Sequence, residues 1–232
     1  MIGVITSLVR YLSFGYGIKL NRKFIAPGFA WCILTLLGMK IRSDIDRSRT
    51  ETCIYFFNHN SFLDLFLVPY ISLENTRFII TEGVKSILPL HLCNLGIDVL
   101  YIPDTHKTEE RIQFFKRVSK DLSEGKYSVI CSPEGRHPFI NGIAPLNKGV
   151  FHMAFASKRP IHQLFFDIKT SGSPDAIKNI ITGVIHIKTI EIVATESWKE
   201  DELPVHMNSM RKEFLSYYYK ANGDYGESKL EA

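Results

Sequence analysis

Short runs of apolar residues alternate with longer runs of helical spacing along most of this chain. The pattern predicts strands at 53–57, 77–81, 96–102, 126–131, 161–166 and 183–195, and helices at 61–70, 83–94, 105–122, 148–157 and 201–220. The last strand-like run changes phase near Thr189, which predicts a β-bulge or two short strands. Strands that alternate with helices predict an α/β domain with a mostly parallel central sheet flanked by helices.

Two apolar runs at the start of the chain do not follow this alternation. The first, residues 2–18, has Arg10 in its middle, and the second, 24–39, contains Pro27 and Gly28. Each is shorter than the roughly 20 residues that a membrane-spanning helix needs. Basic residues flank both runs, which favours two short helices lying on an anionic membrane surface. The alternative is that both helices pack on the protein's own core.

The chain therefore divides into three predicted parts. Residues 1–42 form the membrane-associating helices, 43–221 form the catalytic domain, and 222–232 form a polar, flexible tail.

Composition limits the cellular locations and the binding partners that we expect for this protein. The net charge of +4 is modest, and no basic patch is interleaved with stacking aromatics, so we expect no nucleic-acid partner. No secretory signal peptide is recognisable, and we expect the protein on the cytosolic face of a membrane. Four cysteines lie far apart in apolar surroundings, which predicts buried thiols in a reducing compartment, without a disulfide framework or a zinc site: Cys32, Cys53, Cys93 and Cys131.

The chemistry centres on the polar turn that follows the strand at 53–57. His59 stands in this turn, and Ser61 can cap the next helix, whose first turn contains Asp64. A carboxylate that holds one ring nitrogen of a histidine leaves the other nitrogen to act as a base. A second pair, His162 and Asp167, has the same spacing but lies in a strand-like run, where an odd offset places the two side chains on opposite faces.

A second polar turn, Ser132-Pro133-Glu134-Gly135-Arg136, follows the strand that ends at residue 131. Ligands of open α/β sheets bind beyond the carboxyl ends of the strands, so we expect the two turns to share one site. There Gly135 permits close backbone approach and Arg136 can bind a phosphate. Lys148 opens the next helix, and either binds the same phosphate or is an ordinary solvated lysine.

Three blocks of the chain together resemble the glycerolipid (lysophospholipid) acyltransferase family, whose best-known members are 1-acyl-sn-glycerol-3-phosphate acyltransferases. The blocks are Asn-His-x4-Asp at 58–64, Pro-Glu-Gly-Arg at 133–136, and Lys-Gly-Val-Phe-His-Met-Ala with Arg-Pro-Ile at 148–161. The resemblance implies transfer of a fatty acyl group from a coenzyme A or acyl-carrier-protein thioester to a lysolipid hydroxyl at a membrane.

The same resemblance implies roles for single residues. His59 would be the general base, and Asp64 would orient it. The glycerol-phosphate end of the acceptor would lie against Glu134, Gly135 and Arg136. Backbone N–H groups near Asn60 and Ser61 could stabilise the oxyanion. Neither a metal nor a cofactor is expected, because a thioester is already activated.

The chain departs from the family pattern at two places. Arg136 follows Gly135 directly, and His137 stands at the usual arginine position. After the strand at 96–102, the nearest basic residues are Lys107 and Arg111. Both departures concern the acceptor, so lysophosphatidate, another lysophospholipid and an acylated amino-acid lipid all stay open. An acyl hydrolase or transacylase, and a non-catalytic lipid-binding protein, are the competing functions; a serine hydrolase is disfavoured because the chain has no Gly-x-Ser-x-Gly sequence.

Overall fold

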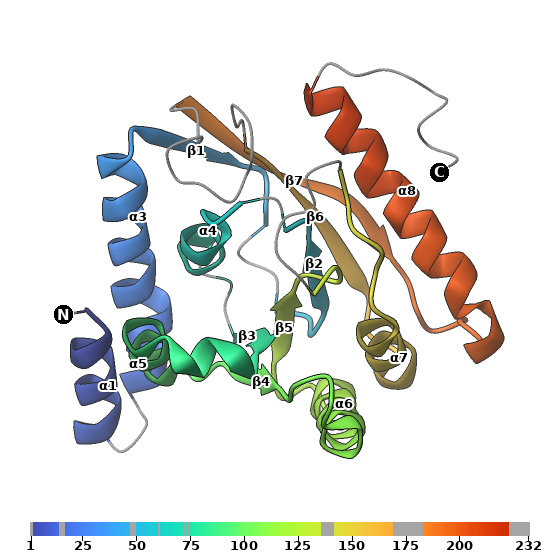
Figure 1. The fold of residues 1–232 in the computed structure, drawn as a ribbon, viewed down its shortest axis with the longest axis horizontal. Helices are drawn as coiled ribbons and strands as arrows, with labels where there is room; N and C mark the ends of the chain where they lie inside the picture. Colours follow the sequence, from blue (N-terminus) through green and yellow to red (C-terminus); the bar gives the residue numbers. More distant parts are fainter. Residues whose placement is uncertain are drawn as a thin grey trace.

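A seven-stranded sheet runs through the centre of the part of the chain that the computed structural model describes (Figure 1). That part comprises residues 2–13, 17–46, 50–59, 61–71, 73, 75–135, 142–168 and 183–222. The strands are β1 (Met39–Ser43), β2 (Ile54–Phe57), β3 (Thr76–Thr81), β4 (Leu100–Ile102), β5 (Ser128–Cys131), β6 (Ile161–Asp167) and β7 (Gly183–Val193).

The strand order is β1-β7-β6-β2-β5-β3-β4, and every neighbouring pair is parallel except β6 and β7. This arrangement confirms the predicted α/β fold with a mostly parallel sheet. Strands β2 and β5 are parallel neighbours, so the turns that follow them lie at the same edge of the sheet.

Helices cover both faces of this sheet (Figure 1). Ile54 and Phe56 belong to the core on the face covered by α6, α7 and α8, whereas Tyr55 and Phe57 belong to the core on the face covered by α3 and α4. Successive residues of β2 thus serve opposite cores, as the two-residue period of a strand requires. The helices that pack on the sheet are α3 (Ala26–Leu36), α4 (Asp64–Ile71), α6 (Thr108–Ser123), α7 (Lys148–Ser157) and α8 (Leu203–Asn222).

The N-terminal segment packs against α5 (Leu88–Ile97) through α1 (Ile2–Leu12). A Cβ atom at Gly96 would lie 2.3 Å from the Cβ atom of Thr6, so only glycine permits this close helix contact. Carbonyl groups at the C-terminal end of α5 accept hydrogen bonds from Arg10, Asn21 and Arg22. Two of the basic residues near the N-terminus therefore bind the protein itself.

Among the described residues, no helix is long and apolar enough to cross a bilayer. Between α1 and α3 the chain forms the short helix α2 (Gly17–Leu20) and a π-helical turn over Asn21–Ile25. The outer surfaces of α1 and α3 expose large apolar side chains: Val4, Ile5, Leu8, Tyr11, Leu12, Phe29, Trp31 and Leu36.

Several local predictions need correction. Residues 96 and 97 end α5 and do not begin a strand, since Asp98 adopts a left-handed conformation (φ +58°) that terminates the helix. Strand β1 was not predicted because it lies at the edge of the sheet and buries only Met39. Cys32 is exposed and Cys93 is half-buried, contrary to the expectation of four buried thiols.

The predicted irregularity in the last strand is confirmed. Gln163 pairs with Glu191, but the next residue of β6, Leu164, pairs with Thr189. Ile190 is therefore the extra residue of a β-bulge, next to the position where the alternation changes phase.

Candidate active site

Asn58 holds the turn after β2 in place. Its side-chain Nδ2 donates to the Phe166 carbonyl oxygen at 3.1 Å, and the Phe166 amide donates to Asn58 Oδ1 at 2.6 Å. The buried amide side chain thus imitates a strand backbone and prolongs the pairing of β2 with β6 beyond Phe57. This role was not predicted from the sequence, although an asparagine directly after a buried strand is its signal.

His59 and Asp64 lie within hydrogen-bonding distance, with 2.6 Å between His59 Nδ1 and Asp64 Oδ2. Asp64 is 2% exposed in the first turn of α4, whereas the His59 side chain is 23% exposed. A carboxylate at Nδ1 favours the tautomer with its proton on that atom, so Nε2 carries the lone pair. The arrangement can accept a proton from a hydroxyl group at Nε2 and stabilise the imidazolium that forms.

Ser61 closes the turn between these two residues. Its Oγ accepts a hydrogen bond from the Leu63 amide at 3.2 Å, which supports the predicted capping role, although α4 itself begins at Asp64. The Ser61 amide lies 3.4 Å from Asp64 Oδ2 and therefore points at the carboxylate. Asn60, the other residue predicted to donate a backbone N–H group to an oxyanion, lies outside the described residues.

Glu134 links the turn after β5 to the turn after β2. Its side chain is buried, Oε1 accepts the His59 amide at 2.8 Å, and Oε2 accepts the Ala144 amide at 2.8 Å. Burial raises the pKa of Glu134 to about 7, against the opposing effect of the two backbone hydrogen bonds. The structure thus brings the two predicted turns together at one edge of the sheet.

Gly135 and Asn147 join the second turn to the start of α7. Gly135 has φ +61°, and a Cβ atom there would lie 2.4 Å from Asn147 Nδ2. The same Nδ2 atom donates to the Glu134 carbonyl oxygen at 2.7 Å. Glycine is therefore required by the backbone conformation and by the approach of Asn147.

Two cations were predicted to lie at this edge, Lys148 and Arg136, and the structure describes the first of them. Lys148 is the exposed first residue of α7. Arg136 lies outside the described residues.

The basic residues after β4 make contacts within their own part of the fold. Lys107 forms an ion pair with Glu82. Arg111 Nη1 donates to the Pro103 carbonyl oxygen at 2.8 Å. These two residues therefore stabilise the loop between β4 and α6.

The comparison pair His162 and Asp167 behaves as its spacing predicts. Both residues belong to β6, and their odd offset places the side chains on opposite faces of the sheet. The same sequence spacing therefore produces a hydrogen-bonded pair in a turn and a separated pair in a strand.

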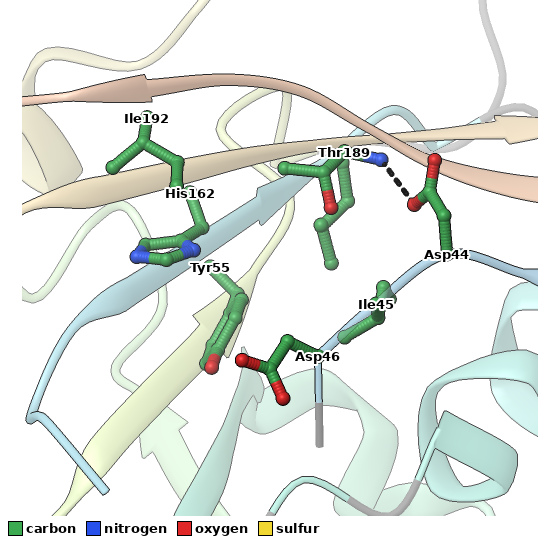
Figure 2. A pocket seen from close by; sticks show the side chains of 8 residues that line it. Asp44, Ile45, Asp46, Tyr55, His162, Thr189 and Ile192 are labelled. Carbon is green, nitrogen blue, oxygen red and sulfur yellow. Dashed lines mark hydrogen bonds between the residues drawn. The ribbon is translucent and has the colours of Figure 1, made fainter. Parts of the chain in front are cut away.

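A cavity of about 190 Å³ lies near the amino ends of β2 and β6, and His59 is not among the residues that line it (Figure 2). Its lining combines acidic, aromatic and apolar side chains: Asp44, Ile45, Asp46, Tyr55, His162, Leu164, Thr189 and Ile192. Asp44 Oδ1 accepts a hydrogen bond from the Thr189 amide at 2.8 Å (Figure 2). Within the described part of the chain, no group of three or more histidine, cysteine, aspartate or glutamate side chains could hold a metal ion.

The sequence of this chain is similar to those of known acyltransferases. A family model described as "Acyltransferase" matches residues 40–166. A 1-acyl-sn-glycerol-3-phosphate acyltransferase from Cocos nucifera is 23% identical over 177 residues, which cover 74% of this chain and 55% of the relative. An uncharacterized acyltransferase from Schizosaccharomyces pombe is 24% identical over 163 residues, which cover 68% of this chain and 57% of the relative. The chain thus spans little more than half the length of these relatives.

The fold is also similar to a solved structure. The crystal structure of the 1-acyl-sn-glycerophosphate (LPA) acyltransferase PlsC from Thermotoga maritima matches with a TM-score of 0.63 and 15% sequence identity. The match covers 93% of this chain and 96% of that protein. At this identity the likeness establishes a shared fold.

Proposed function

Because the chain belongs to the acyltransferase family, we propose that it transfers a fatty acyl group from a thioester carrier to a lysolipid hydroxyl, with 1-acyl-sn-glycerol-3-phosphate as the acceptor. The observation that carries this proposal is the 2.6 Å hydrogen bond between His59 Nδ1 and the buried carboxylate of Asp64. It supplies a base at the carboxyl edge of the sheet, where ligands of such folds bind. The carrier is coenzyme A or acyl-carrier protein.

In the proposed reaction, His59 Nε2 removes the proton of the acceptor hydroxyl as the oxygen attacks the thioester carbonyl carbon. The tetrahedral intermediate then collapses: the C–S bond breaks, the new ester C–O bond remains, and the proton on Nε2 passes to the leaving thiolate. Asp64 stabilises the transient imidazolium from the Nδ1 side. The imidazole therefore returns to its starting state after one turnover.

The acceptor phosphate is the natural ligand for cations at the same edge. We assign this role to Lys148, which is exposed at the start of α7, and to Arg136. Backbone N–H groups near Asn60 and Ser61 are the proposed donors to the oxyanion, and the direction of the Ser61 amide towards Asp64 favours Asn60 for this role.

The exposed apolar surface of α1 and α3 supports association with a membrane, where the lysolipid resides. Tyr11 is 80% exposed, Leu12 66%, Trp31 56% and Leu36 83%. Large apolar side chains at this exposure gain free energy when they enter the acyl region of a bilayer. Phe62, next to the His59 turn, is 36% exposed as well, so an apolar residue also lies close to the proposed site.

The test of this function is a panel of lysolipids incubated with purified protein and a radiolabelled acyl thioester. We expect a diacyl product with lysophosphatidate, and its rate should exceed that with lysophosphatidylcholine or an acylated amino-acid lipid. If product forms only with another lysolipid, the proposed acceptor is wrong, but the proposed acyl-transfer reaction stands. Release of free fatty acid without any acylated product would contradict the transfer reaction.

A further inference from the structure

Glu134 connects three segments that are remote in sequence. It follows β5, and its two carboxylate oxygens accept hydrogen bonds from the backbone amides of His59 after β2 and Ala144 before α7. The main-chain carbonyl of Glu134 is itself held by Asn147 at 2.7 Å. The side chain thus ties the backbone of the proposed base to the segment that leads into α7.

Burying the carboxylate of Glu134 costs free energy, which its hydrogen bonds must offset. Glu134 is 2% exposed, and a buried carboxylate is expensive unless its oxygens are hydrogen-bonded. Each oxygen already accepts a backbone N–H group at 2.8 Å. Both donors belong to the protein, which is the arrangement expected for a group that fixes a backbone and not for one that exchanges ligands.

We infer that Glu134 is a positioning residue for His59, acting through the His59 backbone amide, and not a ligand of the acceptor. This inference rests on the proposed function of His59 as the base. The imidazole is then held from two sides: Asp64 fixes the ring at Nδ1, and Glu134 fixes the main chain that carries the ring. His59 and Asp64 are also the titratable groups whose charges act on Glu134.

The experiment is steady-state kinetics of Glu134→Gln, with both substrates varied. Glutamine has nearly the same shape but offers one acceptor oxygen, so either His59 or Ala144 loses its hydrogen bond. A positioning role predicts a kcat about 10–100-fold lower, with the KM of the acceptor within about twofold of wild type. An acceptor ligand would instead raise that KM about tenfold or more with kcat largely kept, and this result would overturn the inference. Glu110→Gln, an exposed change on α6, is the matched control and should leave both constants unaltered.

A second variant covers the case in which Glu134→Gln does not fold. Asn147→Ala removes the side chain that holds the carbonyl groups of Pro133 and Glu134, and should lower kcat in the same way by a smaller factor. An effect of Asn147→Ala confined to the acceptor KM would count against positioning.

A readout that needs no activity separates this inference from the proposed function. The imidazole resonances of His59, assigned in an NMR spectrum by their loss in His59→Ala, should shift in Glu134→Gln while the other histidine resonances stay. Wild-type protein that is inactive on every lysolipid would refute the function but leave this measurement standing. Unchanged His59 resonances in a folded Glu134→Gln protein would refute positioning.

Discussion

Replacing Asp64 with asparagine probes the pair at the centre of the proposed site. Asp64 Oδ2 lies 2.6 Å from His59 Nδ1, and the residue is 2% exposed. The substitution keeps the shape and removes the negative charge that stabilises the imidazolium. Asparagine can also present its NH₂ group to Nδ1, which would place the ring proton on Nε2 and leave the base without a lone pair.

The size of the effect follows from the bond that is lost. A hydrogen bond to a charged group contributes about 1.5–3 kcal/mol, and each 1.36 kcal/mol corresponds to a factor of about ten in rate. Loss of the charge alone therefore lowers kcat about 10–150-fold. A change of tautomer raises the loss towards the full general-base factor of about 10²–10⁴.

The assay follows thiol release from acyl-coenzyme A at saturating lysophosphatidate, with circular dichroism to establish that the variant is folded. Asp201→Asn, an exposed substitution on the short 3-10 helix before α8, is the control and should keep the wild-type rate. A folded Asp64→Asn protein with kcat within about threefold of wild type would refute the reasoning, because the charge would then have no part in the slow step.

Three further predictions test the surroundings of the site. Gly135→Ala should lower the melting temperature, because a left-handed residue gains a Cβ atom 2.4 Å from Asn147 Nδ2; an unchanged melting curve would contradict the described turn. The double variant Leu12→Ser/Trp31→Ser should bind anionic vesicles at least about tenfold more weakly in a flotation assay, because it removes two exposed apolar side chains, and undiminished flotation would rule out these helices as the membrane contact. The raised pKa of Glu134, about 7, gives a contribution to folding stability that is complete below about pH 4.5 and is lost as the pH rises through 7. Denaturant titrations should therefore show the free energy of unfolding of wild type falling by on the order of 3 kcal/mol relative to that of Glu134→Gln as the pH rises over this range, whereas a constant difference would refute the shifted pKa.

Much of the sheet could be predicted because its central strands are continuous apolar runs. Residues 54–57 and 128–131 are buried along their whole length, and such runs between polar turns have few other interpretations. The turns after them could be predicted to meet once the two strands were taken as parallel neighbours. The contact between His59 and Glu134 confirms that step.

Edge elements and helix ends could not be predicted in the same way. Strand β1 alternates apolar Met39 and Ile41 with charged Lys40 and Arg42, but it is only five residues long and exposes most of them, so only its pairing with β7 defines it. Gly96 looked like the start of a strand, but a tertiary contact with Thr6 explains its presence in α5. Information of this kind lies in the partner element and not in the local sequence.

The candidate site, too, could be predicted from the sequence only in part. The spacing of His59 and Asp64 was informative only with its context, since His162 and Asp167 have the same spacing in β6. The family resemblance suggested Glu134 as a ligand of the acceptor, but sequence could not show that both of its oxygens accept backbone N–H groups.

The most direct test of the central claim is the rate of acyl transfer to lysophosphatidate by His59→Ala. The matched control is His152→Ala, because the His152 side chain is 49% exposed on α7. We predict that His59→Ala lowers kcat by a factor of about 10²–10⁴ or more with its circular dichroism spectrum unchanged, while His152→Ala keeps the wild-type rate. A folded His59→Ala protein that acylates lysophosphatidate as fast as wild type would contradict the assignment of His59 as the base.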